Sequence, residues 1–198
     1  VQRRPQPADE TLAKAAATAR RTTELRFVAI DDVQVLVEPA QIANTVYFFG
    51  AGHVAQPTVH LAAMTGFRTE ILDDRRSFAN PERFPEADRI RVLADYGDAT
   101  AAIAADATSF IVIFTRGHRH DLTVLEQALR TEAAYVGMIG STRKRDAIFK
   151  TLLSKGFTQA DIARVHSPIG LDIGAETPEE IGISIVAELI QRRAQLRA

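Results

Sequence analysis

The fold is specified by residues 45–70, which contain Tyr47-Phe48-Phe49-Gly50-Ala51-Gly52-His53-Val54-Ala55. A short apolar run ends at two glycines one residue apart, a helical pattern follows, and a second apolar run ends at Asp73-Asp74. This is the order strand, phosphate-binding turn, helix and strand, with an acid about 20 residues on, placed to reach a ribose. Gly50 allows the tight turn, and Gly52 lets backbone approach a pyrophosphate. The alternative is a strand-to-helix turn that binds no ligand.

From residue 45 onward, strand-like and helix-like segments alternate. The expected strands are 45–49, 68–72, 90–93, 110–114 and 135–138, and the expected helices are 54–64, 98–105, 122–130, 142–154, 158–165 and 178–196. The run Phe110–Phe114 is apolar throughout, as expected for a parallel strand covered on both faces. Because crossovers between parallel strands are right-handed, these segments predict a doubly wound sheet. We therefore predict an α/β fold, with a Rossmann-like parallel sheet and C-terminal helices over residues 45–198.

Residues 1–44 are predicted to form an N-terminal extension with its own elements. Residues 1–10 are polar, contain two prolines and indicate an unstructured lead-in. The Ala-rich stretch 11–21 predicts a helix, and the alternating segments 26–30 and 33–37 predict a β-hairpin that turns at Asp31-Asp32.

Composition excludes several classes of protein. The formal net charge of −1 over 198 residues argues against a dedicated nucleic-acid or anionic-membrane surface. No apolar run approaches the length of a membrane span, and the N-terminus lacks the apolar core of a signal peptide. The chain has no cysteine, so it is not a disulfide-stapled secreted domain and cannot itself carry a persulfide or a zinc–cysteine site. We expect a cytoplasmic protein.

The unusual loops of the sequence follow the expected strands. Because ligands of open parallel sheets bind outside the carboxyl ends of the strands, these loops are expected to line one crevice. Asp73 stands where a ribose-binding acid belongs, while Arg75 and Arg76 directly after it are suited to a 2′-phosphate, so NAD and NADP both stay open. The residues predicted to bind a cofactor are Gly50, Gly52, His53, Val54, Asp73, Asp74, Arg75, Arg116, Gly117, His118, Gly140, Ser141 and Arg143.

The loop after the fourth strand contains His118-Arg119-His120-Asp121, which allows two interpretations. Imidazole and carboxylate groups suit a metal ion. Alternatively, Asp121 caps the next helix and the histidines line an anion site with Arg116 and Arg119. We favour the second interpretation and predict no metal site, because the neighbouring positive side chains oppose a second cation.

Two further positions have chemical potential. Ser141-Thr142, followed by Arg143-Lys144-Arg145, predicts either an anion site at a helix start or an ordinary N-cap with a solvated basic face. His53 lies within the glycine turn, where it is suited to a phosphate contact or to proton transfer. The candidates for a catalytic role are His53, His118 and His120.

Several motifs, in order, resemble the XdhC/CoxI family, accessory proteins that mature molybdenum hydroxylases such as xanthine dehydrogenase. The matching segments cover about Glu38 to Leu189 and are 49–55, 66–67, 73–75, 82–85, 115–121, 135–141, 144–145 and 166–181. The resemblance implies a Rossmann-like C-terminal domain in a protein that binds the molybdenum cofactor (molybdopterin), supports its sulfuration by a cysteine desulfurase and delivers it to a target molybdenum hydroxylase. It also implies a homodimer.

Many family members carry an additional N-terminal domain with glycine and cysteine motifs. Residues 1–37 are too short to form that domain and contain no cysteine. The resemblance therefore implies either the C-terminal portion of a longer protein or a variant without that domain. It favours a cofactor chaperone without turnover chemistry over the alternative function, an NAD(P)-dependent oxidoreductase, which the glycine turn and Asp73 support. A metal-dependent hydrolase built on His118, His120 and Asp121 is the third alternative.

Overall fold

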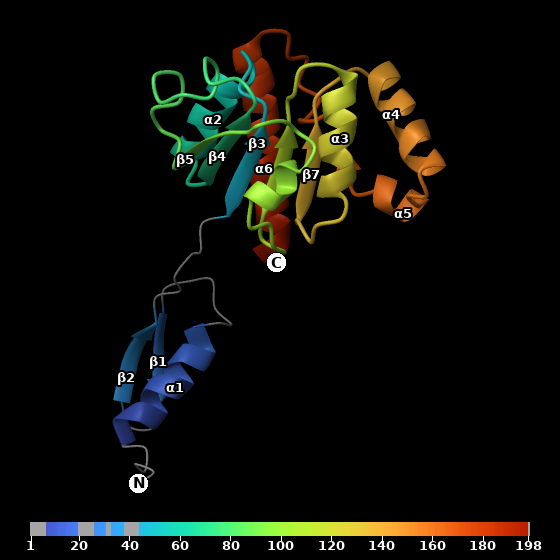
Figure 1. Cartoon of the computed structure of the whole chain (residues 1–198). Helices are drawn as coiled ribbons and strands as arrows, with labels where there is room; N and C mark the ends of the chain where they lie inside the picture. Colours follow the sequence, from blue (N-terminus) through green and yellow to red (C-terminus); the bar gives the residue numbers. More distant parts are fainter. Residues whose placement is uncertain (1–6, 20–25, 31–32, 38–43, 198) are drawn as a thin grey trace. The chain divides into compact units, whose positions relative to one another are not determined.

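The computed structural model describes residues 7–19, 26–30, 33–37 and 44–197, and the chain divides into two compact units, residues 1–42 and 43–196. The first unit contains helix α1 (Pro7–Ala19), which begins four residues before the predicted start, and a two-stranded antiparallel sheet, β1 (Arg26–Ile30) and β2 (Val33–Val37) (Figure 1). The two predicted strands of the hairpin and their antiparallel pairing are therefore confirmed. Residues 1–6 of the predicted lead-in, residues 20–21 of the predicted helix and the Asp31-Asp32 turn lie outside the described residues.

The second unit is built on a six-stranded sheet whose neighbouring strands are all parallel. The strands are β3 (Thr45–Phe49), β4 (Arg68–Asp73), β5 (Arg89–Val92), β6 (Phe110–Ile113), β7 (Tyr135–Met138) and β8 (Val165–His166). Their order is β5-β4-β3-β6-β7-β8. Within this unit that is the 3-2-1-4-5-6 order of a Rossmann fold, so the predicted fold class is confirmed. The order reverses between β3 and β6, which places the topological switch point outside the carboxyl ends of these two strands.

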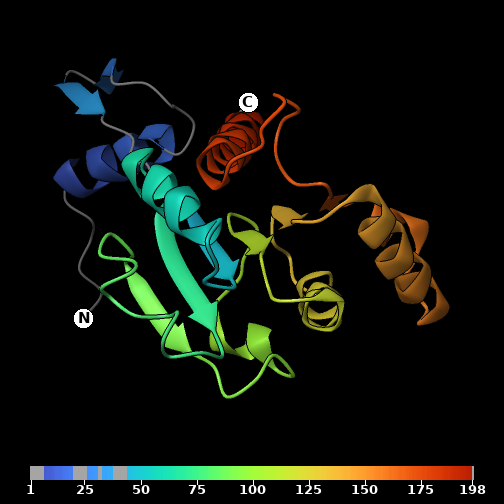
Figure 2. The ribbon, with the colours of Figure 1, turned by 90° about the horizontal axis from the view of Figure 1, so that it is seen from above.

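Helices cover both faces of the sheet, as Figure 2 shows for α2 (Ala55–Met64) and α6 (Pro178–Arg197) on one side and α3 (His118–Ala128) on the other. Alternate residues of the central strand enter two separate apolar cores. Val46 and Phe48 belong to the core that includes residues of α2 and α6. Tyr47 and Phe49 belong to the core that includes residues of α3, α4 (Thr142–Ser154) and α5 (Gln159–Ile162). The period of two along β3 therefore anchors both helical layers.

Some predicted elements differ from those in the structure. The sixth strand, β8, was not predicted because it is only two residues long, and the predicted helix 158–165 is the short α5 followed by this strand. The predicted helix 98–105 is one turn of 3₁₀-helix, η1 (Ala99–Ala102). Helix α3 begins at His118 instead of residue 122, directly after Gly117, whose φ of +83° suits glycine. In the ranges that the structure describes, no helix combines the length and the apolar character needed to cross a membrane.

Candidate functional site

The glycine turn joins β3 to α2 at the switch point. Gly50 has a φ of +111°, and a Cβ atom there would lie 2.5 Å from the carbonyl oxygen of Phe114, at the end of β6. Its N–H donates to the Leu72 carbonyl at 2.7 Å, so the turn is fixed against both neighbouring strands. By contrast, a Cβ at Gly52 would meet no atom within 4 Å. The space in front of Gly52 is open, as the approach of a ligand to this backbone requires.

Asp73, at the end of β4, has a fully buried carboxylate that binds the glycine turn. Its Oδ2 accepts the Ala51 N–H at 2.8 Å and an Nη2–H of Arg75 at 2.8 Å. Its Oδ1 accepts the backbone N–H and the Nε–H of Arg75 at 2.9 and 2.8 Å. Burial opposes ionisation, but the hydrogen bonds from Arg75 and Ala51 outweigh it and lower the pKa of Asp73. Both oxygens therefore have partners inside the protein.

Asp74 and Arg116 meet across the end of β3. Arg116 Nη2 donates to Asp74 Oδ2 at 2.6 Å, and the Arg116 side chain is 52% exposed. Asp74 follows β4 and Arg116 follows β6, the two strands that flank β3. Their ion pair therefore spans the carboxyl end of the strand from which the glycine turn leaves, and it places a partly exposed guanidinium at the switch point.

The segment after β4 supplies a contact to the glycine turn that the sequence did not predict. Arg83 Nη2 donates to the side-chain carbonyl of Gln56 at 2.8 Å and approaches the Ala51 carbonyl oxygen at 3.4 Å. The guanidiniums of Arg75 and Arg83 lie 3.8 and 5.0 Å from the centre of the Phe78 ring. The sequence did contain a signal for this contact, because segment 82–85, which includes Arg83, is one of the segments that resemble the family. No role was predicted for it.

The side chains of the segment 118–121 do not converge. Asp121 lies in the first turn of α3 but is fully buried, and its carboxylate accepts the Thr115 hydroxyl at 2.6 Å and pairs with Lys144. Burial raises the pKa of Asp121, against the opposing effects of Lys144 and Thr115. The His118 side chain is exposed, and the His120 ring centre is 5.1 Å from that of the buried Tyr96.

One prediction about this segment, that Asp121 caps the next helix, can be compared with the structure. Asp121 bonds to Thr115 and Lys144 instead of capping α3, since the N-cap residue of this helix is Gly117, with no side-chain cap. Over the described ranges, no three His, Cys, Asp or Glu side chains gather in a group that would hold a metal ion.

The loop after β7 binds back to α3. The Ser141 hydroxyl accepts the Lys144 N–H at 3.3 Å, which is the N-cap arrangement of α4. Lys144 Nζ donates to the Ile139 carbonyl at 3.1 Å in addition to its ion pair with Asp121. A Cβ at Gly140 would lie 2.6 Å from Lys144 Cδ, so this glycine makes room for the lysine stem. The exposed Arg143 stands on the first turn of α4. The half-buried Lys144 therefore connects the loop after β7 to the first turn of α3, a role that the sequence did not predict.

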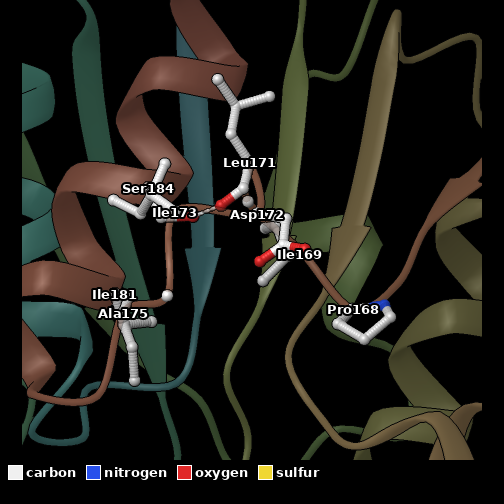
Figure 3. A pocket seen from close by; sticks show the side chains of 10 residues that line it. Pro168, Ile169, Leu171, Asp172, Ile173, Ala175, Ile181 and Ser184 are labelled. Atoms are coloured by element: carbon white, nitrogen blue, oxygen red, sulfur yellow. Dashed lines mark hydrogen bonds between the residues drawn. The ribbon is translucent and has the colours of Figure 1, made fainter.

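A pocket of about 410 Å³ lies between the loop after β8 and the first turns of α6. Its walls are residues 168–175 together with Ile181 and Ser184, and Figure 3 shows the loop running alongside α6. Leu171 is fastened to this helix, because its N–H donates to the Ser184 carbonyl at 3.2 Å and its carbonyl accepts the Ser184 hydroxyl. The loop leaves the carboxyl end of β8 and runs back along α6, where the Gly170 N–H donates to Glu188 Oε2 at 2.6 Å. The lining of the pocket combines Ile and Leu side chains with loop backbone.

The strand order and the glycine turn at the switch point define the class of this domain as Rossmann-like. Residues 46–189 match the XdhC Rossmann domain, and the chain belongs to this family. The chain is 34% identical over 148 residues to a probable xanthine dehydrogenase subunit of Bacillus subtilis, a match that covers 75% of this chain and 42% of that protein. It is 23% identical over 145 residues to the molybdenum cofactor insertion chaperone PaoD of Escherichia coli, covering 73% of this chain and 39% of that protein.

Among solved structures, the chain resembles a xanthine dehydrogenase from Bacillus halodurans, with a TM-score of 0.68 and 31% identity. That likeness covers 82% of this chain and 45% of the other. The chain therefore matches less than half the length of each of these relatives.

Proposed function

We propose that this chain binds the molybdenum cofactor as cargo and takes part in its insertion into a molybdenum hydroxylase of the xanthine dehydrogenase type. Two of the similar proteins support this proposal by name, one as part of a xanthine dehydrogenase and one as a molybdenum cofactor insertion chaperone. The cargo is a phosphate-bearing pterin, which is an anion attached to a flat heterocycle. A site for it therefore requires anion donors beside a surface suited to a ring.

The observation that carries the proposal is the open space over Gly52 at the start of α2. A helix N-terminus offers backbone N–H groups and a positive dipole end, which suit a phosphate. In the proposal, Gly52, His53 and Val54 receive the phosphate, and Asp73 contributes by fixing the Ala51 amide. Arg75, which binds Asp73, and the neighbouring Asp74 belong to the same site at the end of β4.

Two further groups extend this site along the crevice. Arg116, with Gly117 and His118 beside it, adds a partly exposed positive charge at the switch point. The residues of the loop after β7, Gly140, Ser141 and Arg143, add the N-terminus of α4.

The pocket beside α6 is suited to the ring of the cargo, because Ile169, Leu171 and Ile181 line it. When bound, the cargo would supply the molybdenum centre that the target enzyme uses. The residues of this chain would hold and orient it, and the proposal assigns no turnover chemistry to His53, His118 or His120.

The alternative function, an NAD(P)-dependent oxidoreductase, draws on the same glycine turn. An NAD-binding Rossmann domain uses an acid at the end of the second strand to accept the ribose hydroxyls. Here the acid in that position, Asp73, already accepts four N–H groups from Ala51 and Arg75. A ribose would have to displace donors that hold the glycine turn, so this observation favours the cofactor-delivery proposal.

The partners and setting in the proposal rest on the family. They are a molybdenum hydroxylase as target, a cysteine desulfurase that acts on the cargo, a homodimer of this chain and the cytoplasm as compartment. Because the chain has no cysteine, the sulfur of the cargo would come from the desulfurase without a persulfide on this chain.

The proposal is tested by ligand-dependent thermal stability. Molybdenum cofactor, NAD(H) and NADP(H) are each added to the chain and to the variant Gly52→Val. A ligand at about 100 times its Kd stabilises the folded state by about 2.7 kcal/mol, which raises the Tm of a domain of this size by roughly 5–10 °C. We expect this shift with molybdenum cofactor for the original chain and its loss in the variant, whose new side chain occupies the open space.

The matched control is Ala107→Val, an exposed position in the turn before β6, at the opposite edge of the sheet. It adds a similar side chain and should leave the ligand-induced shift intact. An undiminished shift in Gly52→Val would refute the assignment of the site. A shift with NADPH alone, together with oxidation of NADPH in the presence of carbonyl compounds, would replace the proposal by the oxidoreductase.

A further inference from the structure

A second polar pocket, of about 410 Å³, lies away from the glycine turn. Its walls come from residues 132–134, which precede β7, from residues 163, 164 and 166 around the start of β8, and from Arg192 near the end of α6. Because β7 and β8 are parallel, the residues before them lie at the amino edge of the sheet. The glycine turn follows the carboxyl end of β3, so the two sites use opposite edges of the sheet.

Two arginines in this pocket donate their hydrogen bonds to neutral groups, and Arg164 also interacts electrostatically with the Asp161 carboxylate. Arg164 donates to the carbonyl oxygens of Leu129 and Thr131, each at 2.9 Å. Arg192 donates through Nε to the Ala134 carbonyl at 3.2 Å and through Nη1 to the side-chain oxygen of Gln195 at 3.3 Å. Carbonyl oxygens fix the position of a guanidinium but do not neutralise its charge. Within the described part of the chain, these bonds leave Arg164 Nε and Arg192 Nη2 as remaining donors.

The third group is His166, whose ring orientation is set by the half-buried carboxylate of Glu188. His166 Nδ1 lies 2.7 Å from Glu188 Oε1. The other oxygen, Oε2, accepts the Tyr135 hydroxyl at 2.7 Å and the Gly170 N–H at 2.6 Å. Burial opposes ionisation of Glu188, but these hydrogen bonds outweigh it and lower its pKa, so the carboxylate accepts a hydrogen bond from Nδ1–H.

This arrangement leaves Nε2 as the ring nitrogen that is free to meet a ligand. The His166 side chain is 38% exposed and lines the pocket, while Glu188 is 13% exposed. The imidazole ring centre lies 4.5 Å from that of Tyr135, so the imidazole is held on a second side. A pocket that combines a fixed imidazole with two guanidiniums matches the donors used for oxyanions. One carboxylate, that of the exposed Glu132, also lines this pocket and limits the charge that it can accept.

We propose that this pocket is a second binding site, which takes a small oxyanion such as a phosphate or carboxylate group between Arg192, Arg164 and His166. Arg192 Nη2 and Arg164 Nε supply N–H donors, and His166 Nε2 bonds to a hydroxyl of the protonated anion or, as imidazolium, donates to it. The size of the pocket suits a small molecule or a single phosphate group of a larger one. This site is independent of the glycine turn and of the cargo proposed for it.

The test follows the Cε1–H signals of the histidines by NMR while inorganic phosphate or acetate is added to the full chain. His166→Gln identifies the His166 signal. We expect a saturable shift of that signal with at least one of the two probes. Arg192→Gln should weaken that binding by about tenfold, because it removes a charge-assisted donor, and Arg192→Lys should restore part of it.

The matched control is Arg193→Gln, which removes the same charge from the next residue of α6. Arg193 instead donates to the Thr65 carbonyl at 3.0 Å and lies over the Phe67 ring. This control, and Gly52→Val at the glycine turn, should change the affinity by less than about twofold. The proposal is overturned if neither probe shifts the His166 signal, or if Arg192→Gln binds the probe as tightly as the original chain does. A Gly52→Val variant that loses cargo binding but keeps this shift separates the two sites.

Discussion

The two glycines of the turn between β3 and α2 should respond in opposite ways to the same substitution. In Gly50→Ala, the new Cβ would lie 2.5 Å from the Phe114 carbonyl oxygen and 2.6 Å from its carbon. The φ of +111° adds strain of about 1–2 kcal/mol for a residue with a Cβ. Relief of the clash must move the end of β6, where the Phe114 N–H donates to the Phe49 carbonyl at 2.7 Å, and such overpacking costs about 1–3 kcal/mol. We therefore expect Gly50→Ala to lower the free energy of unfolding by about 2–5 kcal/mol.

At Gly52 the added methyl group meets nothing within 4 Å, and the backbone φ lies outside the left-handed region. Gly52→Ala should therefore raise the free energy of unfolding by about 0.4–1 kcal/mol, because it restricts the unfolded chain. Urea denaturation measures both values, and thermal unfolding should show a Tm lower by roughly 5–15 °C for Gly50→Ala alone. The reasoning is refuted if the two variants lose equal stability, or if Gly50→Ala is as stable as the original chain.

Three further substitutions test the contacts around the crevice. Asp73→Asn should lower the free energy of unfolding by about 2–3 kcal/mol at pH 7, since the carboxylate has internal donors. Because the pKa of Asp73 is lowered, its contribution to stability is present above its ordinary pKa of about 4 and is lost as the pH falls. In urea denaturation, the free energy of unfolding of the variant should therefore fall less steeply between about pH 5 and pH 3 than that of the original chain. Lys144→Met should cost about 3–5 kcal/mol by leaving Asp121 buried without its ion pair. Because the pKa of Asp121 is raised, the penalty should shrink at low pH, and Lys144→Met with Asp121→Asn should recover most of the loss in a double-mutant cycle; additive losses would contradict the pairing. Arg116→Gln removes a half-exposed ion pair and should change stability by less than about 1 kcal/mol, while isothermal titration should show roughly tenfold weaker binding of molybdenum cofactor. Unchanged affinity would remove Arg116 from the site.

The fold could be predicted because its signals are local. The apolar run before Gly50, the helical pattern after it and the continuous run Phe110–Phe114 each depend on residues close together in the chain, so hydrophobic periodicity revealed them. Elements with weak local signals were mispredicted. The two residues of β8 are too few to show a period, and its strand character comes from pairing with Val136 and Gly137 of β7.

The candidate site was predicted as a set of loops but not as a set of contacts. The carboxyl-edge rule gathered the loops correctly, because it follows from the parallel sheet alone. The Ser141 N-cap was among the predicted alternatives, but the partners of Asp121 were not predicted. The sequence suggested that Asp121 would cap a helix, and the structure pairs it with Thr115 and Lys144, the latter 23 positions further on. No local pattern specifies such a pair, because it depends on how the first turns of α3 and α4 pack.

The sequence by itself determined the class of fold, the position of the glycine turn and the family, since each of these is encoded in contiguous motifs. Tertiary structure alone decided how the turn is held and what lies open around it. Asp73 is bound to Ala51, 22 positions before it, and Gly50 is packed against Phe114, 64 positions after it. Gly52 is neither bound to Asp73 nor packed against Phe114, and the space beside it is open. Such differences arise only when β4, β3 and β6 lie side by side, because the sheet brings distant residues within hydrogen-bond or van der Waals distance.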